Sequence, residues 1–199
     1  MAIKDKLKFV DWKVTQNNII NTSLTGDRYV ANLGNSHWEF KLKSAPYDRN
    51  GVGSEVTPNM PLSTDNTEIF TFTLPTPLDD SKGTVSSTIT VSASTSDGAS
   101  PSAQSRKINV TGGAGTLKSG DFIKFSNHTK VYMLTADTNL DGSSVDAVHL
   151  YPPLIKSVSG ATITYDDVQI RAVPIGKAFE YSIGVADEIV WEQQFREVV

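Results

Sequence analysis

Hydrophobic and polar residues alternate with a period of two over much of the chain. The clearest runs are 38–43, 70–74, 89–93 and 179–183, in which apolar residues at every second position are separated by Glu, Lys, Thr or Ser. Because consecutive residues of a β-strand point to opposite faces of a sheet, these runs predict strands with one buried and one polar face. Further strands are expected at 28–32, 107–110, 122–125, 130–135, 147–151, 162–164, 169–173 and 189–193.

Turn residues separate nearly all of these runs, and no stretch sustains the apolar spacing of an α-helix over three turns. Short, closely spaced strands with frequent Gly, Pro, Asn and Asp indicate an all-β sandwich or barrel. Two segments depart from the pattern. Residues 44–66 are rich in Pro, Gly, Asn and Ser and predict a long connection, and residues 94–105 predict an exposed hairpin tip or mobile loop.

Composition narrows the function classes. The 199 residues are 38% hydrophobic and 20% charged, with a formal net charge of -4, so a general nucleic-acid binder with a basic stripe is not expected. The absence of cysteine excludes disulfides, thiolate catalysis and Cys-type zinc sites. Residues 1–14 lack a signal-like apolar core, and no apolar run approaches the roughly 20 residues of a membrane helix. We expect a soluble protein that folds in the compartment where it is made.

The sharpest local motif is Asp137-Thr138-Asn139-Leu140-Asp141-Gly142. It matches the first half of a calcium loop, in which oxygen ligands stand at positions one, three and five and glycine at position six. The second half fails, because Val148 stands where a bidentate Glu is needed. Asp and Asn before Gly are also ordinary turn residues. We therefore predict a turn at Asp137, Asn139 and Asp141 that binds no calcium.

Other candidate chemistry is weak. The glycines at 112–115 superficially suggest a phosphate loop, but they more simply let the chain change direction between strands. His37, His128 and His149 lack ligand spacing. Asp166 and Asp167 are adjacent and, on a strand, would face opposite sides. The sequence thus predicts no catalytic, cofactor-binding or metal-binding residues, no cofactor and no enzyme.

Three tryptophans leave two interpretations open. Trp38 and Trp191 each precede a glutamate, which is typical of a core aromatic beside an outward polar neighbour, and Trp12 lies in a similar setting. Core packing is the plain interpretation. The alternative is an aromatic platform that stacks on a sugar or a partner chain.

Several segments resemble bacteriophage distal tail and baseplate hub proteins. The opening resembles a polar strand followed by a strand of the form Gly-x-x-x-Trp-x-Phe, and later segments resemble a Leu-x-x-Gly-Asp-Phe-Ile strand, a Pro-Pro-Leu closure and an acidic closing strand. The residues that carry the likeness are Gln16 to Arg28, Gly34 to Leu42, Ala45 to Tyr47, Leu117 to Phe125, Lys130 to Leu134, Leu150 to Leu154, Phe179 to Tyr181 and Trp191 to Val199.

The resemblance implies a ring-forming β-sandwich core with an inserted smaller OB-like β-barrel. The core would comprise residues 1–59 plus 174–199, and the barrel residues 60–173, with Phe122, Ile123, Val131, Leu150 and Ile163 in its own core. The strand at 38–43 would pair with 179–183 or 189–193.

The implied function is that of a structural virion protein of the tail tip or baseplate. It would be assembled in the host cytoplasm into a homo-oligomeric ring, which we expect to be hexameric. The ring would join the tail tube to distal components, with its neighbours among tail tube and baseplate proteins, and leave a channel through which DNA passes. No membrane contact is expected. Two alternatives stay open: a carbohydrate-binding β-sandwich module and, more weakly, a glycan-cleaving β enzyme.

Overall fold

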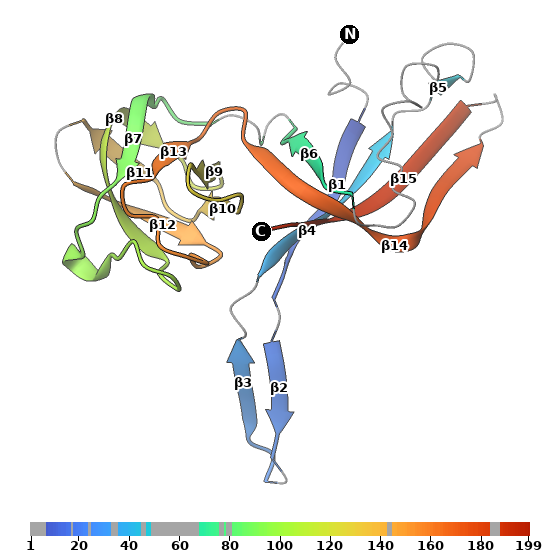
Figure 1. Ribbon diagram of the computed structural model, residues 1–199, viewed down its shortest axis with the longest axis horizontal. Coiled ribbons are helices and arrows are strands. Elements are labelled where there is room, and N and C mark those ends of the chain that lie inside the picture. The colour runs from blue at the N-terminus through green and yellow to red at the C-terminus, as the bar shows by residue number, and fades with distance from the viewer. Residues whose placement is uncertain are drawn as a thin grey trace.

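The computed structural model describes residues 7–16, 18–23, 25–32, 36–44, 47–48, 68–75, 78, 81–142, 145–183 and 188–199. Within these ranges the regular structure is β-strand, apart from one 3₁₀ turn, η3 (Ser96–Gly98). The all-β prediction is confirmed. The strands form a sheet, a barrel beside it and a hairpin that points away from both (Figure 1).

The sheet contains the two ends of the described chain. Its antiparallel order is β1-β4-β15-β14-β6, with β5 paired to one end of β15. β15 lies between β4 and β14, and its residue Phe195 pairs with Phe40. The strands are β1 (Leu7–Thr15), β4 (His37–Ser44), β5 (Tyr47–Asp48), β6 (Phe70–Thr73), β14 (Gln169–Ile183) and β15 (Glu188–Glu197).

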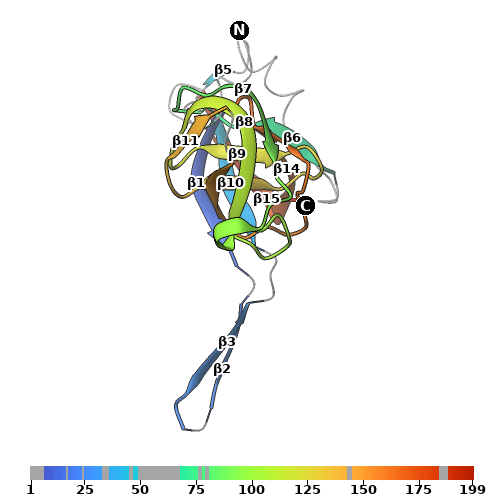
Figure 2. The same ribbon diagram turned by 90° about the vertical axis from the view of Figure 1, so that its left-hand side faces the viewer.

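The barrel is built from the middle of the chain. Its strands follow the order β8-β12-β10-β9-β13-β7, and a further pairing of β7 with β8 closes the circle. β11 pairs with residues 114–117 of β8, beyond residues 107–110, which pair with β12 (Figure 2 shows β8 and β11). Closure removes most free strand edges. The strands are β7 (Ser86–Val91), β8 (Lys107–Leu117), β9 (Phe122–Phe125), β10 (Val131–Leu134), β11 (Thr138–Asp141), β12 (Asp146–Tyr151) and β13 (Thr162–Thr164).

The glycines at 112–115 lie inside one long strand, β8, and do not separate two strands as the sequence suggested. Gly112, Gly113 and Gly115 adopt positive φ, and the register of β7 against β8 shifts between Ser86 and Ile89. A Cβ at Gly113 would stand 2.7 Å from the Ile89 side chain. The glycines therefore let β8 bend sharply while it stays paired with three neighbours.

Segment 94–105 lies in the connection between β7 and β8, which pair antiparallel, so it is the hairpin connection that the sequence predicted, and residues 95–98 and 102–104 are exposed. Ala99 and Pro101 are buried, and the backbone N–H of Gln104 donates to the Leu154 carbonyl at 2.7 Å. The Asn109 side chain donates to the Ser96 hydroxyl at 3.0 Å. The segment is thus a packed loop on the barrel, because its small side chains hydrogen-bond locally in place of a strand ladder.

The sheet and the barrel are built from different parts of the chain. β6 and residues 169–172 pair with each other inside the sheet, although both fall in the range 60–173 expected for the inserted unit. Sheet pairing alone does not delimit domains, so the division into 1–59 plus 174–199 and 60–173 stays a prediction. The same holds for the second layer of a sandwich, since the described residues form one sheet here.

The expected barrel core is right in part. Ile123, Leu150 and Ile163 lie in the barrel core. Phe122 and Val131 belong instead to the core of the sheet. They alternate with inward-facing neighbours on β9 and β10, so their side chains leave the barrel on its outer face.

The connection expected at 44–66 lies outside the described residues, apart from Ser44, Tyr47 and Asp48. So do Ala45 and Pro46, which carried part of the family likeness. No helix in the part of the chain that the structure describes has the length and hydrophobicity needed to cross a membrane.

Candidate functional site: the joint between sheet and barrel

One buried carboxylate joins the sheet to the barrel. Glu197, at the end of β15, accepts the backbone N–H of Val131 at 2.7 Å and that of Trp38 at 3.1 Å. It also forms an ion pair with Lys130, and the side chains of both partners are fully buried. The indole of Trp38 donates to the Val131 carbonyl at 2.8 Å. β4, β15 and the start of β10 therefore meet at this carboxylate.

The electrostatics of this pair follow from its burial. Loss of solvent raises the pKa of Glu197 and lowers the pKa of Lys130, and their mutual attraction opposes both changes. A buried charge is tolerated only where charges and hydrogen bonds replace its water. Glu197 has one opposite charge and two backbone N–H donors, which together replace the water that its carboxylate loses.

An aromatic cluster surrounds the polar joint. The ring of Trp38 lies 5.4 Å from that of Phe122 on the barrel and 5.3 Å from that of Trp12 on β1. Phe40 stacks on Phe195 at 5.7 Å. Such pairs contribute stability beyond the area that they bury. Core packing is thereby shown for Trp38 and Trp191, and Trp12 packs against the same cluster.

A second charged cluster lies on the opposite face of β4. Glu39 is almost fully buried beneath Arg196 at 3.0 Å, His37 at 3.1 Å and Lys13 at 3.2 Å. Burial raises the pKa of Glu39, but hydrogen bonds from His37, Lys13 and Arg196 outweigh it and lower the pKa to about 2. The alternation of β4 thus places an aromatic residue on one face and this carboxylate on the other.

The structure does not form the turn expected at Asp137, Asn139 and Asp141. Thr138–Asp141 is strand β11, paired with 114–117 of β8, and Gly142 with its positive φ follows it. Asp137 is engaged by Lys118 Nζ at 2.7 Å and by the Ser119 N–H at 2.8 Å. Thr138 and Leu140 alternate with the polar residues Asn139 and Asp141 along β11, and their side chains are buried. This short alternation was the signal in the sequence that could have predicted a strand. That these residues bind no calcium stays a prediction.

The remaining candidates lie apart from one another. His37 contacts Glu39, and His128 shares a hydrogen bond with the Tyr132 hydroxyl at 2.8 Å. Asp166 and Asp167 lie beyond β13, not on a strand, and Asp166 accepts the Ser81 N–H at 3.3 Å. Across the described ranges, no group of three or more His, Asp or Glu residues is placed to hold a metal ion.

Sequence reasoning missed both charged clusters. Lys130 precedes an apolar run and Glu197 lies in the acidic end of the chain, so each has the signature of an exposed residue. The one available signal was that both lie next to buried strand residues. Their pairing over 67 positions is a product of the tertiary fold.

Comparison with known families identifies the barrel. Residues 86–164 match the family model described as distal tail protein pb9, B domain. The match begins at the first residue of β7 and ends at the last residue of β13, which are the bounds of the barrel strands. The barrel is thus similar to a domain of a phage distal tail protein, which supports the resemblance of the chain to that family. No curated protein sequence matches it.

The match supports a structural role in the phage tail and a location in the tail of the virion. The family also implies association with other tail components. The matched barrel supplies the part of the joint that contains Lys130 and Val131, and the flanking segments supply Trp38 and Glu197. The joint is therefore a place at which the matched barrel packs on the rest of the protein.

Proposed function

We propose that this protein assembles, in the host cytoplasm, into a closed hexameric ring that joins the tail tube to the distal tail and leaves a channel for DNA. In this proposal the chain is a mechanical part of the tip or baseplate and not an enzyme. The family match of the barrel supports the location. The observation that carries the ring is the hairpin formed by β2 (Asn18–Thr22) and β3 (Arg28–Asn32).

This hairpin stands clear of the rest of the molecule in two perpendicular views (Figures 1 and 2). β2 pairs only with β3 among the described strands. A two-stranded hairpin alone in water is marginally stable, so an arm of this kind gains stability by packing on another surface. We propose that this surface belongs to the neighbouring copy in the ring.

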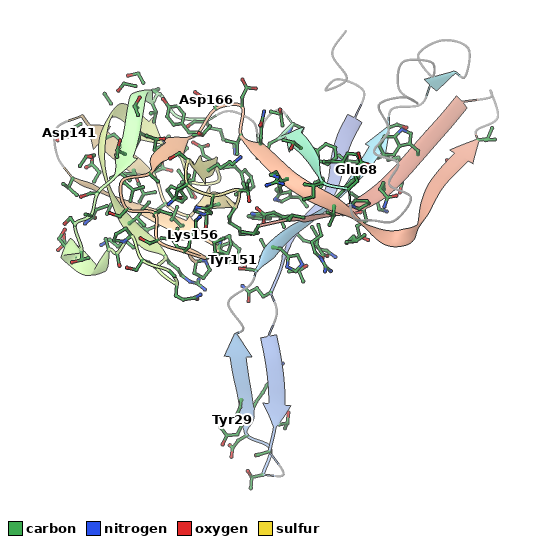
Figure 3. The ribbon with its side chains drawn as sticks, in the orientation of Figure 1. Tyr29, Glu68, Asp141, Tyr151, Lys156 and Asp166 are labelled. Carbon is green, nitrogen blue, oxygen red and sulfur yellow. The ribbon has the colours of Figure 1, made fainter. Side chains whose placement is uncertain are left out.

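The composition of the arm fits a buried contact. Among its ten strand residues only Arg28 is charged, whereas free strand edges are usually protected by lysine, proline or inward charges. Tyr29 is 64% exposed near the turn (Figure 3), and exposed tyrosines are common anchors of interfaces. An arm from each copy onto the next is a heterologous contact, which closes into a ring when the rotation allows it.

The test compares the assembly state of the native chain with that of a variant whose residues 18–32 are replaced by a short Gly/Ser turn. Mass photometry and negative-stain electron microscopy should show hexameric rings for the native protein. The variant should be a folded monomer, because the arm contributes nothing to the pairing of the sheet or barrel. Ile183→Ala, at another exposed apolar position, is the matched control and should keep the rings.

Two results contradict the proposal. One is a native protein that stays monomeric at high concentration, both alone and with tail tube protein, and gives no ring in images of virions. The other is a variant without the arm that still forms rings, which would place the subunit contact elsewhere.

The positions of Trp38 and Trp191 do not support the carbohydrate-binding alternative. Trp38 and Trp191 are 4% and 1% exposed, so neither offers a face on which a sugar could stack. Tyr151 on the barrel is half-buried, and its hydroxyl accepts a hydrogen bond from Gln16 at 3.0 Å. The structural role therefore stays the proposal.

A further inference from the structure

The chain passes between sheet and barrel twice, once after β6 and once before β14. A unit attached through two connections can swivel unless further contacts fix it. The joint supplies such contacts, since Glu197 of the sheet bonds to Val131, the first residue of β10, and to Lys130, which directly precedes this strand. The orientation of the barrel therefore depends on contacts outside the two connections.

We propose that Glu197 is a latch that fixes the orientation of the barrel on the sheet. This inference does not depend on the ring. The carboxylate holds one ammonium group and two backbone N–H groups that come from both units, and no exposed surface is left on either charged side chain. Any rotation of the barrel would pull Lys130 from its partner and leave two buried charges without compensation.

Contacts on either side of Glu197 strengthen the latch. The N–H of Val198 donates to the Arg171 carbonyl at 2.8 Å, which anchors the end of the chain on β14. The Thr129 hydroxyl, on the barrel side, donates to the Val198 carbonyl at 3.4 Å. The end of β15 thus lies between β14 and the barrel and holds both. Aromatic packing of Trp38 on Phe122 adds area without the directional preference of the carboxylate.

The absence of cysteine allows the orientation to be measured by spin labels on the full chain. A label pair at Thr71→Cys on β6 and Ser159→Cys on the barrel reports the sheet–barrel distance, since both sites are exposed. A second pair at Ser119→Cys and Ser159→Cys lies within the barrel and reports its integrity. Double electron–electron resonance gives the distance distribution for each pair.

The variants are Glu197→Gln and Lys130→Met, with Asp137→Asn as the matched control. Asp137 pairs with Lys118 at 2.7 Å within the barrel, so its loss removes an ion pair without touching the latch. The native chain and the control should give one narrow sheet–barrel distance. Both latch variants should at least double the width of that distribution, while the distance within the barrel stays narrow.

A broad sheet–barrel distribution in the native chain overturns the proposal, and so does a native-like narrow distribution in Glu197→Gln. If Lys130→Met disturbs the barrel itself, the distance within the barrel will broaden as well. Glu197→Gln then decides, because it leaves the barrel sequence intact.

Discussion

The indole N–H of Trp38 donates to the carbonyl of Val131 at 2.8 Å, which connects strand β4 of the sheet to β10 of the barrel. Trp38→Phe should keep most of the aromatic packing but leave that buried carbonyl without its donor. We expect a loss of about 1–3 kcal/mol in the free energy of unfolding, measured by urea denaturation. Trp38→Ala should cost about 3–5 kcal/mol. Tyr29→Phe, at an exposed aromatic, is the control and should change stability little.

Glu39 and Glu192 provide a matched pair of carboxylates on the outer face of the sheet. Glu39 is almost buried under three cationic groups, whereas Glu192 is more exposed beside Lys41 at 3.1 Å and Lys43 at 2.8 Å. Glu39→Gln should destabilise the protein by about 1–3 kcal/mol, and Glu192→Gln by less than about 1 kcal/mol. Equal losses would show that burial of Glu39 adds nothing to its ion pairs.

The pH dependence of Glu39 has a definite direction. Its pKa in the folded protein is lowered from 4.5 to about 2, so the carboxylate stabilises the fold above pH 4.5. That contribution is lost as the pH falls from 4.5 towards 2, because protonation removes the charge that the cations hold. The difference in stability between native and Glu39→Gln should therefore shrink over this range.

His128 gives the protein a second pH dependence, at higher pH. Burial, followed by the charges of Lys156, Lys130 and Lys124, lowers its pKa from 6.5 to about 4. The unfolded chain then binds a proton that the folded chain does not, so stability falls as the pH is lowered from 6.5 to about 4. Because the imidazole of His128 is only partly buried, we expect the free energy of unfolding to fall by a total on the order of 2 kcal/mol over this range.

His128→Gln should flatten the stability profile between pH 6.5 and 5, where few carboxylates titrate. The measurement is urea denaturation at several pH values. His149→Gln, which alters an exposed histidine, should keep the native slope. A native slope in His128→Gln would assign the dependence to another group.

The strands and the buried aromatics were predictable from the sequence because they depend on local alternation. Arg28–Asn32, Phe122–Phe125 and Thr162–Thr164 were expected at their observed bounds. Strand β11 was missed because Asp and Asn before Gly favour a turn locally, whereas pairing with β8 imposes an extended strand. In segment 94–105 the burial of Ala99 and Pro101 was not predicted, because the hydrogen bonds that hold the segment on the barrel involve Leu154 and Val158, which are remote in the sequence.

The latch could not be predicted for a related reason. Lys130 and Glu197 are charged residues that sequence patterns assign to the surface. Only the docking of the barrel on the sheet removes water from both, and docking depends on the tertiary fold. The sequence shows that Phe122 and Val131 are apolar residues on strands. Alternation does not tell, however, whether one face of a strand packs into the barrel core or into the core of the sheet.

Replacing Gly113 or Gly160 by alanine should destabilise the protein in two ways, through backbone strain and through steric overlap of the added methyl group, and the two positions differ only in the overlap. Their φ angles are +71° and +72°, so alanine meets a similar backbone strain at both positions. At Gly160 an added Cβ meets no atom within 4 Å, and at Gly113 it would stand 2.7 Å from Ile89 and 3.1 Å from Leu140. Gly160→Ala should cost about 1–2 kcal/mol, and Gly113→Ala about 1–3 kcal/mol more. Equal losses would mean that β8 shifts to admit the methyl group without strain.

The barrel should fold without the sheet. It has a closed strand order and its own buried core, which includes Ile89, Ile123, Phe125 and Leu150. We expect residues 81–168, expressed alone, to give a dispersed amide NMR spectrum and a cooperative thermal transition. The sheet segments, 1–75 joined to 169–199 by a Gly/Ser linker, should aggregate instead, because they lose the apolar side chains that the barrel contributes to their core.

The isolated barrel fragment should also expose apolar side chains that the sheet covers in the whole protein. Phe122, Val131 and Lys130 are buried in the whole protein and would meet water in the fragment. Val131→Thr should therefore raise the solubility of the fragment, while it destabilises the full chain, in which Val131 lies in the core of the sheet. Two results would show that barrel and sheet form a single cooperative unit. One is a barrel fragment that does not fold. The other is a Val131→Thr substitution that lowers both the solubility of the fragment and the stability of the full chain.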